Sequence, residues 1–174
     1  MKTLYLLRHA KSVAGSGDDH GRTLAKRGVA AYESIGRHFS EKKILPELIL
    51  CSTAARARET LDRIAAAAGW AAETPPAEIT RHLYMASGGE ILTIIRTTND
   101  ERGSLMLVGH NPGTEEIARA LVGGGEPEAL AAFAGKYATG ALATIVFDAA
   151  RWSEVGPGMG RLTEFVKPRS LASP

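Results

Sequence analysis

Short apolar runs along the chain alternate with longer stretches that carry apolar residues at helical spacing. Four runs, at residues 3–7, 48–51, 105–108 and 141–147, are predicted to be buried strands, and residues 161–166 are a weaker fifth candidate. The apolar residues in these runs are continuous rather than alternating. That pattern is typical of strands covered on both faces.

Helical spacing of apolar residues marks four stretches, at 28–39, 54–68, 90–98 and 115–122. Strands that alternate with helices of this size predict an α/β fold with helices on both sides of a mainly parallel sheet, which is a three-layer α/β/α arrangement. The polar stretch 12–23 is expected to be a loop.

Several residues are typical of helix ends. Ser52 or Thr53 can cap the helix that follows the second strand. Asn111 can cap a helix that Pro112 starts. The glycines at 123–125 follow a predicted helix rather than a strand, so they are interpreted as a helix stop and a flexible turn.

The chain shows no internal repeat and no low-complexity linker, and residues 1–174 are predicted to form a single domain. The Gly-rich stretch 155–160 is expected to be a turn, and residues 169–174 are expected to be a frayed tail.

Composition narrows the function classes. Hydrophobic residues make up 44% and charged residues 23% of the 174 residues, which is ordinary for a soluble globular protein. The net charge of +2 is too small to argue for nucleic acid or an anionic membrane as partner. The single cysteine, Cys51, excludes an internal disulfide, and no residues have zinc-ligand spacing, so neither metal nor cofactor is predicted. The first apolar run is too short for a signal peptide, and a cytoplasmic location is expected.

Basic side chains follow three of the predicted strands. Arg8 and His9 end the first strand, Arg56 lies in the helix after the second, and His110 follows the third. In an open α/β sheet, ligands bind beyond the carboxyl ends of the strands, so these four side chains are expected to meet. Arg8 and His9 point to opposite faces of a regular strand, so the chain is expected to turn sharply directly after them.

Arginine and histidine are the residue types that a metal-free phosphoryl-transfer site needs. The guanidinium groups of Arg8 and Arg56 match phosphate oxygens in geometry and stay charged. One neutral imidazole can accept a phosphoryl group as a nucleophile. A second imidazole can be protonated and stabilise charge in the transition state.

Three sequence motifs occur in order at these strand ends. Residues 7–10 read Leu-Arg-His-Ala, residues 52–60 carry Ser, three residues, Arg-Ala, two residues and Thr, and residues 108–111 read Val-Gly-His-Asn. They resemble the motifs of the histidine phosphatase superfamily, which includes the phosphoglycerate mutases. The stretches at 22–28 and 139–141 make the chain most similar to SixA-type phosphohistidine phosphatases.

This resemblance implies a phosphoglycerate mutase-like fold and a role for each motif residue. His9 would be the nucleophile that carries the phosphoryl group, and Arg8 and Arg56 would bind its oxygens. His110 would complete the phosphate pocket, and Arg22 would reach the substrate. The partner would be a phosphorylated protein, such as a histidine phosphorelay domain, or a small phosphorylated molecule.

The substrate class is predicted from what the chain lacks. Mutases and many phosphomonoesterases of this superfamily carry a carboxylic acid in an insertion between the second and third motifs. Here Leu105 follows Thr60 by only 45 positions, and Glu78 and Glu90 are the only carboxylates there that could stand in. An alcohol resembles water, with a pKa of about 15.7, and needs a proton to depart, whereas an imidazole with a pKa near 6.5 does not.

These considerations favour phosphohistidine on a protein as the substrate. Two alternatives stay open. One is a phosphomonoesterase or mutase that acts on a small phosphorylated metabolite. The other is a non-catalytic module that binds a phospho-protein.

The remaining polar residues are given structural interpretations. Arg58, His20, His38 and His82 are expected at the surface or at helix ends. Cys51 is expected to be a small buried hydrophobic residue.

Overall fold

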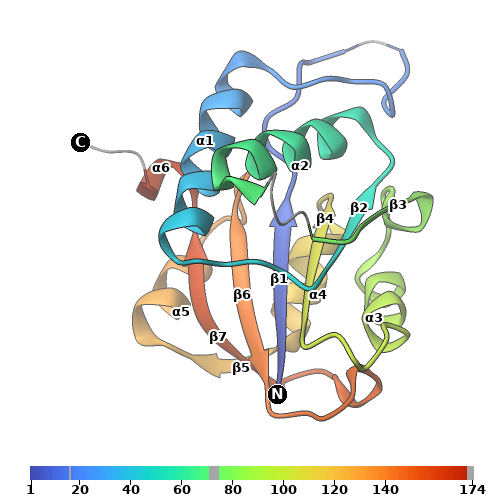
Figure 1. The fold of residues 1–174 in the computed structure, drawn as a ribbon, viewed down its shortest axis with the longest axis vertical. Coiled ribbons are helices and arrows are strands. Elements are labelled where there is room, and N and C mark those ends of the chain that lie inside the picture. The colour runs from blue at the N-terminus through green and yellow to red at the C-terminus, as the bar shows by residue number, and fades with distance from the viewer. Residues whose placement is uncertain (16, 71–74, 172–174) are drawn as a thin grey trace.

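The computed structural model describes residues 1–15, 17–70 and 75–171 (Figure 1). Seven strands form one sheet in the order β3-β2-β4-β1-β6-β7-β5. The strands are β1 (Lys2–Arg8), β2 (Leu48–Ser52), β3 (Ala77–Thr80), β4 (Ser104–Gly109), β5 (Val122–Gly125), β6 (Leu142–Phe147) and β7 (Gly160–Val166). The helices are α1 (Lys26–Glu41), α2 (Ala55–Ala68), α3 (Gly88–Arg96), α4 (Gly113–Leu121), α5 (Pro127–Phe133) and α6 (Pro168–Leu171), and two short 3-10 helices are η2 (Arg81–Leu83) and η3 (Trp152–Glu154).

The sheet is mixed, with mainly parallel pairs. β1 pairs with β4, β4 with β2, β2 with β3, and β5 with β7, all in parallel. β6 is inserted between β1 and β7 and runs antiparallel to both. The five strands predicted from the sequence are all present.

Helices cover both faces of the sheet, as predicted (Figure 1). Successive residues of a strand point to opposite faces, so Leu4 and Leu6 of β1 join one apolar cluster and Leu7 joins the other. The first cluster packs under α3, α4 and α5, and the second packs under α1 and α2. This double coverage explains why the strands are continuously apolar in sequence.

Four predictions of local structure were wrong. The glycine run 123–125 belongs to β5, which pairs with β7, because residues without side chains allow backbones to come this close. Part of the predicted tail, up to Leu171, forms α6, while residues 172–174 lie outside the described residues. Neither Ser52 nor Thr53 is the N-cap of α2: the N-cap is Ala54, whose N–H donates to the Ser52 hydroxyl over 3.3 Å.

The fourth correction concerns α4. Its N-cap is Pro112, which makes no side-chain cap, and the Asn111 amide instead donates to Glu115 Oε2 over 3.0 Å. His110 still lies beside the first turn of this helix, since its carbonyl oxygen accepts the Thr114 N–H at 2.9 Å.

Gly140 fixes the end of the central strand. Its backbone has a φ of +75°, and its N–H lies 3.1 Å from the carbonyl oxygens of both Arg8 and His9. A Cβ atom at this position would lie 2.7 Å from Cγ of Pro168, so α6 packs directly behind the end of β1. The positive φ and the close contact both require glycine here.

Among the described residues, no helix is long and apolar enough to cross a membrane.

Candidate active site

A hollow of about 380 Å³ lies where β1 and β4 end. All five side chains that the sequence analysis singled out for this site line it: Arg8, His9, Arg22, Arg56 and His110. They come from β1, the loop before α1, the first turn of α2, and the segment between β4 and α4. The predicted convergence of basic residues at one edge of the sheet is therefore observed.

The chain leaves the sheet immediately after Arg8, as the sequence analysis required. The His9 N–H still donates to Gly109 on β4 over 3.0 Å, and the Ala10 N–H already donates to the Tyr32 hydroxyl of α1 over 3.0 Å. This exit lets two successive side chains reach the same hollow.

The His9 ring is held in one orientation. Its Nδ1 lies 2.6 Å from the carbonyl oxygen of Ala10, and only 8% of the residue is exposed. A carbonyl can only accept, so Nδ1 carries the proton and Nε2 keeps its lone pair. The ring of His110 lies beside it, with 5.0 Å between the ring centroids.

His110 is fixed from the neighbouring strand. Its Nε2 lies 2.7 Å from the Ser52 hydroxyl at the end of β2, and the ring of Tyr84 packs edge-on against it. Its Nδ1 is buried and has no hydrogen-bond partner among the described residues.

The two arginines are each only partly satisfied by the protein. Arg8 Nη1 donates to the Tyr137 carbonyl over 2.8 Å, and Arg56 Nη1 donates to the Asp19 carbonyl over 2.7 Å. The Nε atoms of both arginines are buried without a hydrogen-bond partner in the part of the chain described here. A buried donor left unpaired costs about 1–3 kcal/mol, so these groups suit a bound anion.

Asp19 is a residue of the hollow that the sequence analysis missed. Its carboxylate accepts the Tyr84 hydroxyl at 2.6 Å, Arg22 Nη2 at 2.6 Å and Arg56 Nη2 at 3.1 Å. Asp19 therefore ties the loop before α1 to α2 and to the segment after η2. The only sequence signal for it was an acidic residue three positions before Arg22 in a polar loop.

Both histidines are neutral in the free site. Burial, followed by the charges of Arg56 and Arg8, lowers the pKa of His9 to about 4. Burial, followed by the neighbouring His9 and Arg56, lowers the pKa of His110 to about 3. The second histidine, which the sequence analysis gave as able to be protonated, is therefore uncharged in the free site.

The pKa of Asp19 is lowered, whereas a carboxyl group that donates a proton near neutral pH needs a raised pKa. The hydrogen bond from Tyr84, then those from Arg22 and Arg56, hold the pKa of the Asp19 carboxyl well below its usual range. The group is ionised throughout the physiological range.

The two carboxylates predicted as possible stand-ins do not reach the hollow. Glu78 is exposed on the edge strand β3. Glu90 is exposed in the first turn of α3, where its carboxylate and the Ser87 hydroxyl form a capping box. Neither lines the hollow, so neither is placed to act there.

The polar residues that the sequence analysis did not assign to the site differ in how far they are exposed. Arg58 and His82 are exposed, as predicted. His38 was expected at the surface or at a helix end: it lies in the last turn of α1 but is buried, and its Nε2 lies 2.9 Å from Glu164 on β7. His20 is half-buried and bonds to the Thr53 hydroxyl over 2.8 Å.

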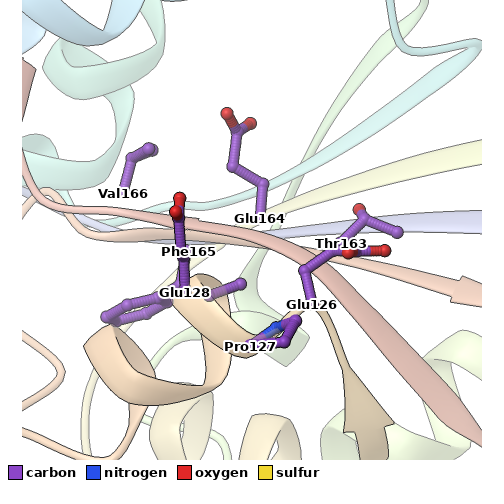
Figure 2. Close-up of a pocket in the computed structure, with 8 residues that line it drawn as sticks. Glu126, Pro127, Glu128, Thr163, Glu164, Phe165 and Val166 are labelled. Carbon is purple, nitrogen blue, oxygen red and sulfur yellow. The ribbon is translucent and has the colours of Figure 1, made fainter.

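A second hollow, of about 570 Å³, lies between the start of α5 and β7 (Figure 2). Three carboxylates line it, those of Glu126, Glu128 and Glu164. No arginine, lysine or histidine is among the described residues that line it, so they do not form a phosphate site.

Comparison with known proteins places this geometry in a family. No family model matches the chain. A protein of Agrobacterium tumefaciens, provisionally assigned as phosphohistidine phosphatase SixA, has a solved structure that is 31% identical in sequence, with a TM-score of 0.79 over 96% of this chain and 98% of that one. This chain belongs to the SixA-like histidine phosphatases.

Other proteins are similar to this SixA-like phosphatase over nearly its whole length. An uncharacterized protein of Mycobacterium tuberculosis is 32% identical over 166 residues, which cover 94% of this chain and 100% of that protein. The structure of the protein histidine phosphatase SixA complexed with tungstate is 21% identical and shares the fold with a TM-score of 0.76 over 98% of this chain and 99% of that one.

Membership of the SixA-like group identifies the chain as an enzyme, a phosphoric monoester hydrolase with a phosphoglycerate mutase-like fold. The alternative of a non-catalytic binding module is thereby set aside.

Proposed function

We propose that this SixA-like phosphatase removes the phosphoryl group from phosphohistidine on a protein, through a phosphohistidine intermediate on His9 and without a metal ion. The single observation that carries the proposal is the state of the His9 ring. It is neutral, it is locked by Ala10 in the tautomer that leaves Nε2 unprotonated, and the residue lines a hollow together with two arginines.

In the first step, the Nε2 lone pair of His9 attacks phosphorus in line. The bond from phosphorus to the substrate imidazole breaks, and its electron pair stays on that imidazole. Arg8, Arg56 and His110 stabilise the charge that spreads over the equatorial oxygens, and Arg22 reaches the substrate.

In the second step, water attacks the phosphorus of the phosphorylated His9. The proton on Nδ1, donated to the Ala10 carbonyl, stays on the ring throughout. The ring therefore departs as a neutral imidazole and needs no further proton. Water supplies the fourth oxygen of the phosphate, and its proton passes to phosphate or solvent.

The chemistry of the leaving group supports phosphohistidine over a phosphate ester. Asp19 is the one carboxylate among the described residues that line the hollow, and its low pKa makes it a poor proton donor. An alcohol needs a proton to leave, whereas an imidazole that already carries a proton on its other nitrogen leaves neutral.

In this proposal, Arg8 and Arg56 rather than a metal ion neutralise the charge of the phosphoryl group. Arg8 and Arg56 offer unpaired donors, and within the described ranges no group of three His, Cys, Asp or Glu side chains is arranged to hold a metal ion. The rim of the hollow is formed by exposed residues, Lys11 and Met85 among them, which leaves room for a protein that carries the phosphohistidine.

Turnover of two substrates tests the proposal. We expect the kcat/KM for a phosphohistidine peptide to exceed that for 3-phosphoglycerate by at least about 100-fold, which corresponds to roughly 2.7 kcal/mol of transition-state stabilisation. Faster hydrolysis of 3-phosphoglycerate would favour the small-molecule phosphomonoesterase instead. Isomerisation of that ester would favour a mutase.

A further inference from the structure

A third hollow, of about 530 Å³, opens beside the candidate active site and is lined by positive charge. Among the described residues, five basic side chains and no carboxylate line it. The five are Lys11, Arg27, Lys136, Lys167 and Arg169. The chain as a whole carries a net charge of only +2, so this is a local concentration of charge.

These cations come from four separate segments that the fold brings together. Lys11 follows β1, and its carbonyl oxygen accepts the Ala25 N–H at 2.9 Å next to the start of α1, where Arg27 lies. Lys136 follows α5. Lys167 and Arg169 lie at the end of β7 and in α6, which packs beside α1 (Figure 1).

None of the five is neutralised by another described residue. The ion pairs in the described part of the chain involve other arginines and His38. Lys167 Nζ lies 5.7 Å from the ring of Phe165, and it would lie 3.5 Å from a Cβ atom at Gly135, next to Lys136. The five like charges thus line one hollow without a counter-charge among the described residues, which leaves them free to meet a bound anion.

The basic hollow is continuous with the candidate active site. Lys11 and Thr139 line both hollows. Pro168 of the basic hollow packs against Gly140, whose N–H bonds to the backbone of Arg8 and His9. A molecule whose phosphoryl group lies against His9 can therefore extend over Lys11 into the basic hollow.

We infer that the basic hollow docks an acidic segment of the phosphorylated protein substrate, next to the phosphorylated residue. This inference rests on the proposed function and adds how the enzyme selects its substrate.

The residues that line the basic hollow suit an acidic protein segment better than a small anion as the ligand. Four of the five cations are exposed and three are lysines, which act as flexible point charges, whereas a tight phosphate site uses buried guanidinium forks, as at Arg56. Exposed charges of one sign steer an oppositely charged partner and set its orientation.

The test compares two phosphohistidine peptides, one with Asp and Glu beside the phosphohistidine and one with Ser and Ala there. For the wild-type protein at low salt, we expect the kcat/KM for the acidic peptide to be about tenfold higher, and this preference to shrink in 0.5 M salt. In the double variant Arg27→Glu and Lys136→Glu, the preference should disappear. Hydrolysis of p-nitrophenyl phosphate, which has no flanking residues, should be unchanged, which also shows that the variant is folded.

A matched control changes the same charge elsewhere. Arg37 and Arg63 are exposed on α1 and α2 and do not line the basic hollow. The double variant Arg37→Glu and Arg63→Glu should keep the wild-type preference. If it loses the preference equally, net charge rather than the basic hollow sets it, and the inference is overturned.

Binding separates this inference from the proposed function. The Kd of the unphosphorylated acidic peptide, measured by fluorescence anisotropy, should rise about tenfold in the Arg27→Glu and Lys136→Glu variant even if no phosphohistidine peptide is hydrolysed. In that case the proposed substrate would be wrong and the docking surface would stand. Hydrolysis of both peptides at equal rates would leave the proposed function standing and overturn the docking surface.

A small anion is the second binding probe. If inorganic pyrophosphate binds as tightly as the acidic peptide, with the same loss of affinity in the Arg27→Glu and Lys136→Glu variant, the hollow is a small-anion site and the inference fails.

Discussion

The carboxylate of Asp19 lies 3.1 Å from Nη2 of Arg56, and the carbonyl oxygen of the same aspartate lies 2.7 Å from Nη1. One residue of the loop before α1 thus holds two of the donors that a phosphoryl group would use. Arg56 is almost completely buried, with 2% of its surface exposed, so its orientation depends on this contact. Asp19 both positions the guanidinium and competes with a bound anion for it.

We expect Asp19→Asn to tighten the binding of phosphate by about three- to tenfold, because it removes a negative charge beside the anion while the amide oxygen can still accept from Arg56. The measurement is the inhibition constant of inorganic phosphate at pH 7. Asp18→Asn is the matched control, since that neighbouring carboxylate is exposed and, within the described part of the chain, accepts the His20 N–H without contacting Arg56. Weaker phosphate binding in Asp19→Asn would show that positioning of Arg56 outweighs the competition.

Replacement of His9 tests the covalent intermediate. We expect His9→Ala to lower kcat by at least about 1,000-fold, because the attacking nitrogen is lost. His82→Ala, at an exposed position outside the hollow, should keep wild-type activity. An alkaline quench of wild-type turnover with a 32P-labelled substrate should trap label on His9. Unlabelled protein during rapid turnover would contradict the two-step route.

The guanidinium geometry of Arg8 is tested by a charge-conserving change. Arg8→Lys keeps the charge but loses the planar fork, and we expect kcat/KM to fall by about 100-fold. Arg58→Lys makes the same change at an exposed position of α2 and should have no effect. A near wild-type value for Arg8→Lys would remove Arg8 from the phosphate pocket.

The depressed pKa values of the two histidines predict how stability depends on pH. His9 and His110 resist protonation in the folded protein down to a pH of about 4 and 3, whereas they take up protons near pH 6.5 when unfolded. The unfolded state therefore binds more protons below pH 6.5, and the free energy of unfolding should fall as the pH decreases from 6.5 to 5. Each histidine contributes about 1.4 kcal/mol per pH unit at most.

Urea denaturation at several pH values measures this dependence. His9→Asn should reduce the slope between pH 6.5 and 5, and His82→Asn should not. The same linkage predicts that tungstate binding at pH 6 takes up protons, because a bound anion raises the pKa of the His110 imidazole, while His9 stays neutral as the nucleophile. Calorimetry in two buffers of different ionisation enthalpy reports this uptake, and a binding enthalpy independent of the buffer would contradict it.

Gly113 allows the start of α4 to pack against the backbone of Ala86, next to Met85 of the hollow. A Cβ atom here would lie 1.8 Å from the carbonyl oxygen of Ala86, so the first turn of α4 can approach the segment after η2 only because the side chain is absent. We expect Gly113→Ala to lower the free energy of unfolding by about 2–3 kcal/mol and to raise KM, since displacement of Ala86 moves Met85 at the rim. Gly124→Ala, where no atom lies within 4 Å, is the control for thermal unfolding.

The central sheet could be predicted because its strands are buried on both faces and therefore continuously apolar. The edge strands β3 and β5 were missed for the opposite reason. The residues of β3 are mostly exposed, and β5 is a run of glycines that pairs closely with β7 and has no apolar pattern. Short strands of this kind are defined by their neighbours, which a pattern along one chain does not contain.

The residues of the candidate site likewise include some that the sequence predicts and some that it does not. Arg8, His9, Arg56 and His110 could be predicted because each follows a strand that the apolar pattern identifies, and parallel strands bring their ends together. Asp19 could not, because it reaches the hollow through the path of an irregular loop, and its partners Arg56 and Tyr84 lie 37 and 65 residues away. The burial of His38 depends likewise on Glu164, which lies 126 residues away on β7.

The only thiol of the protein lies at the end of β2, fully buried, and burial raises its pKa to about 12. A thiol in that state reacts slowly with maleimides, because the thiolate is the reactive form. A single cysteine introduced at an exposed position such as Lys136 would therefore accept a fluorophore selectively in the otherwise native sequence. The natural chain is thus ready for site-specific labelling, and the arrival of a substrate beside Lys136 could be followed in real time by fluorescence.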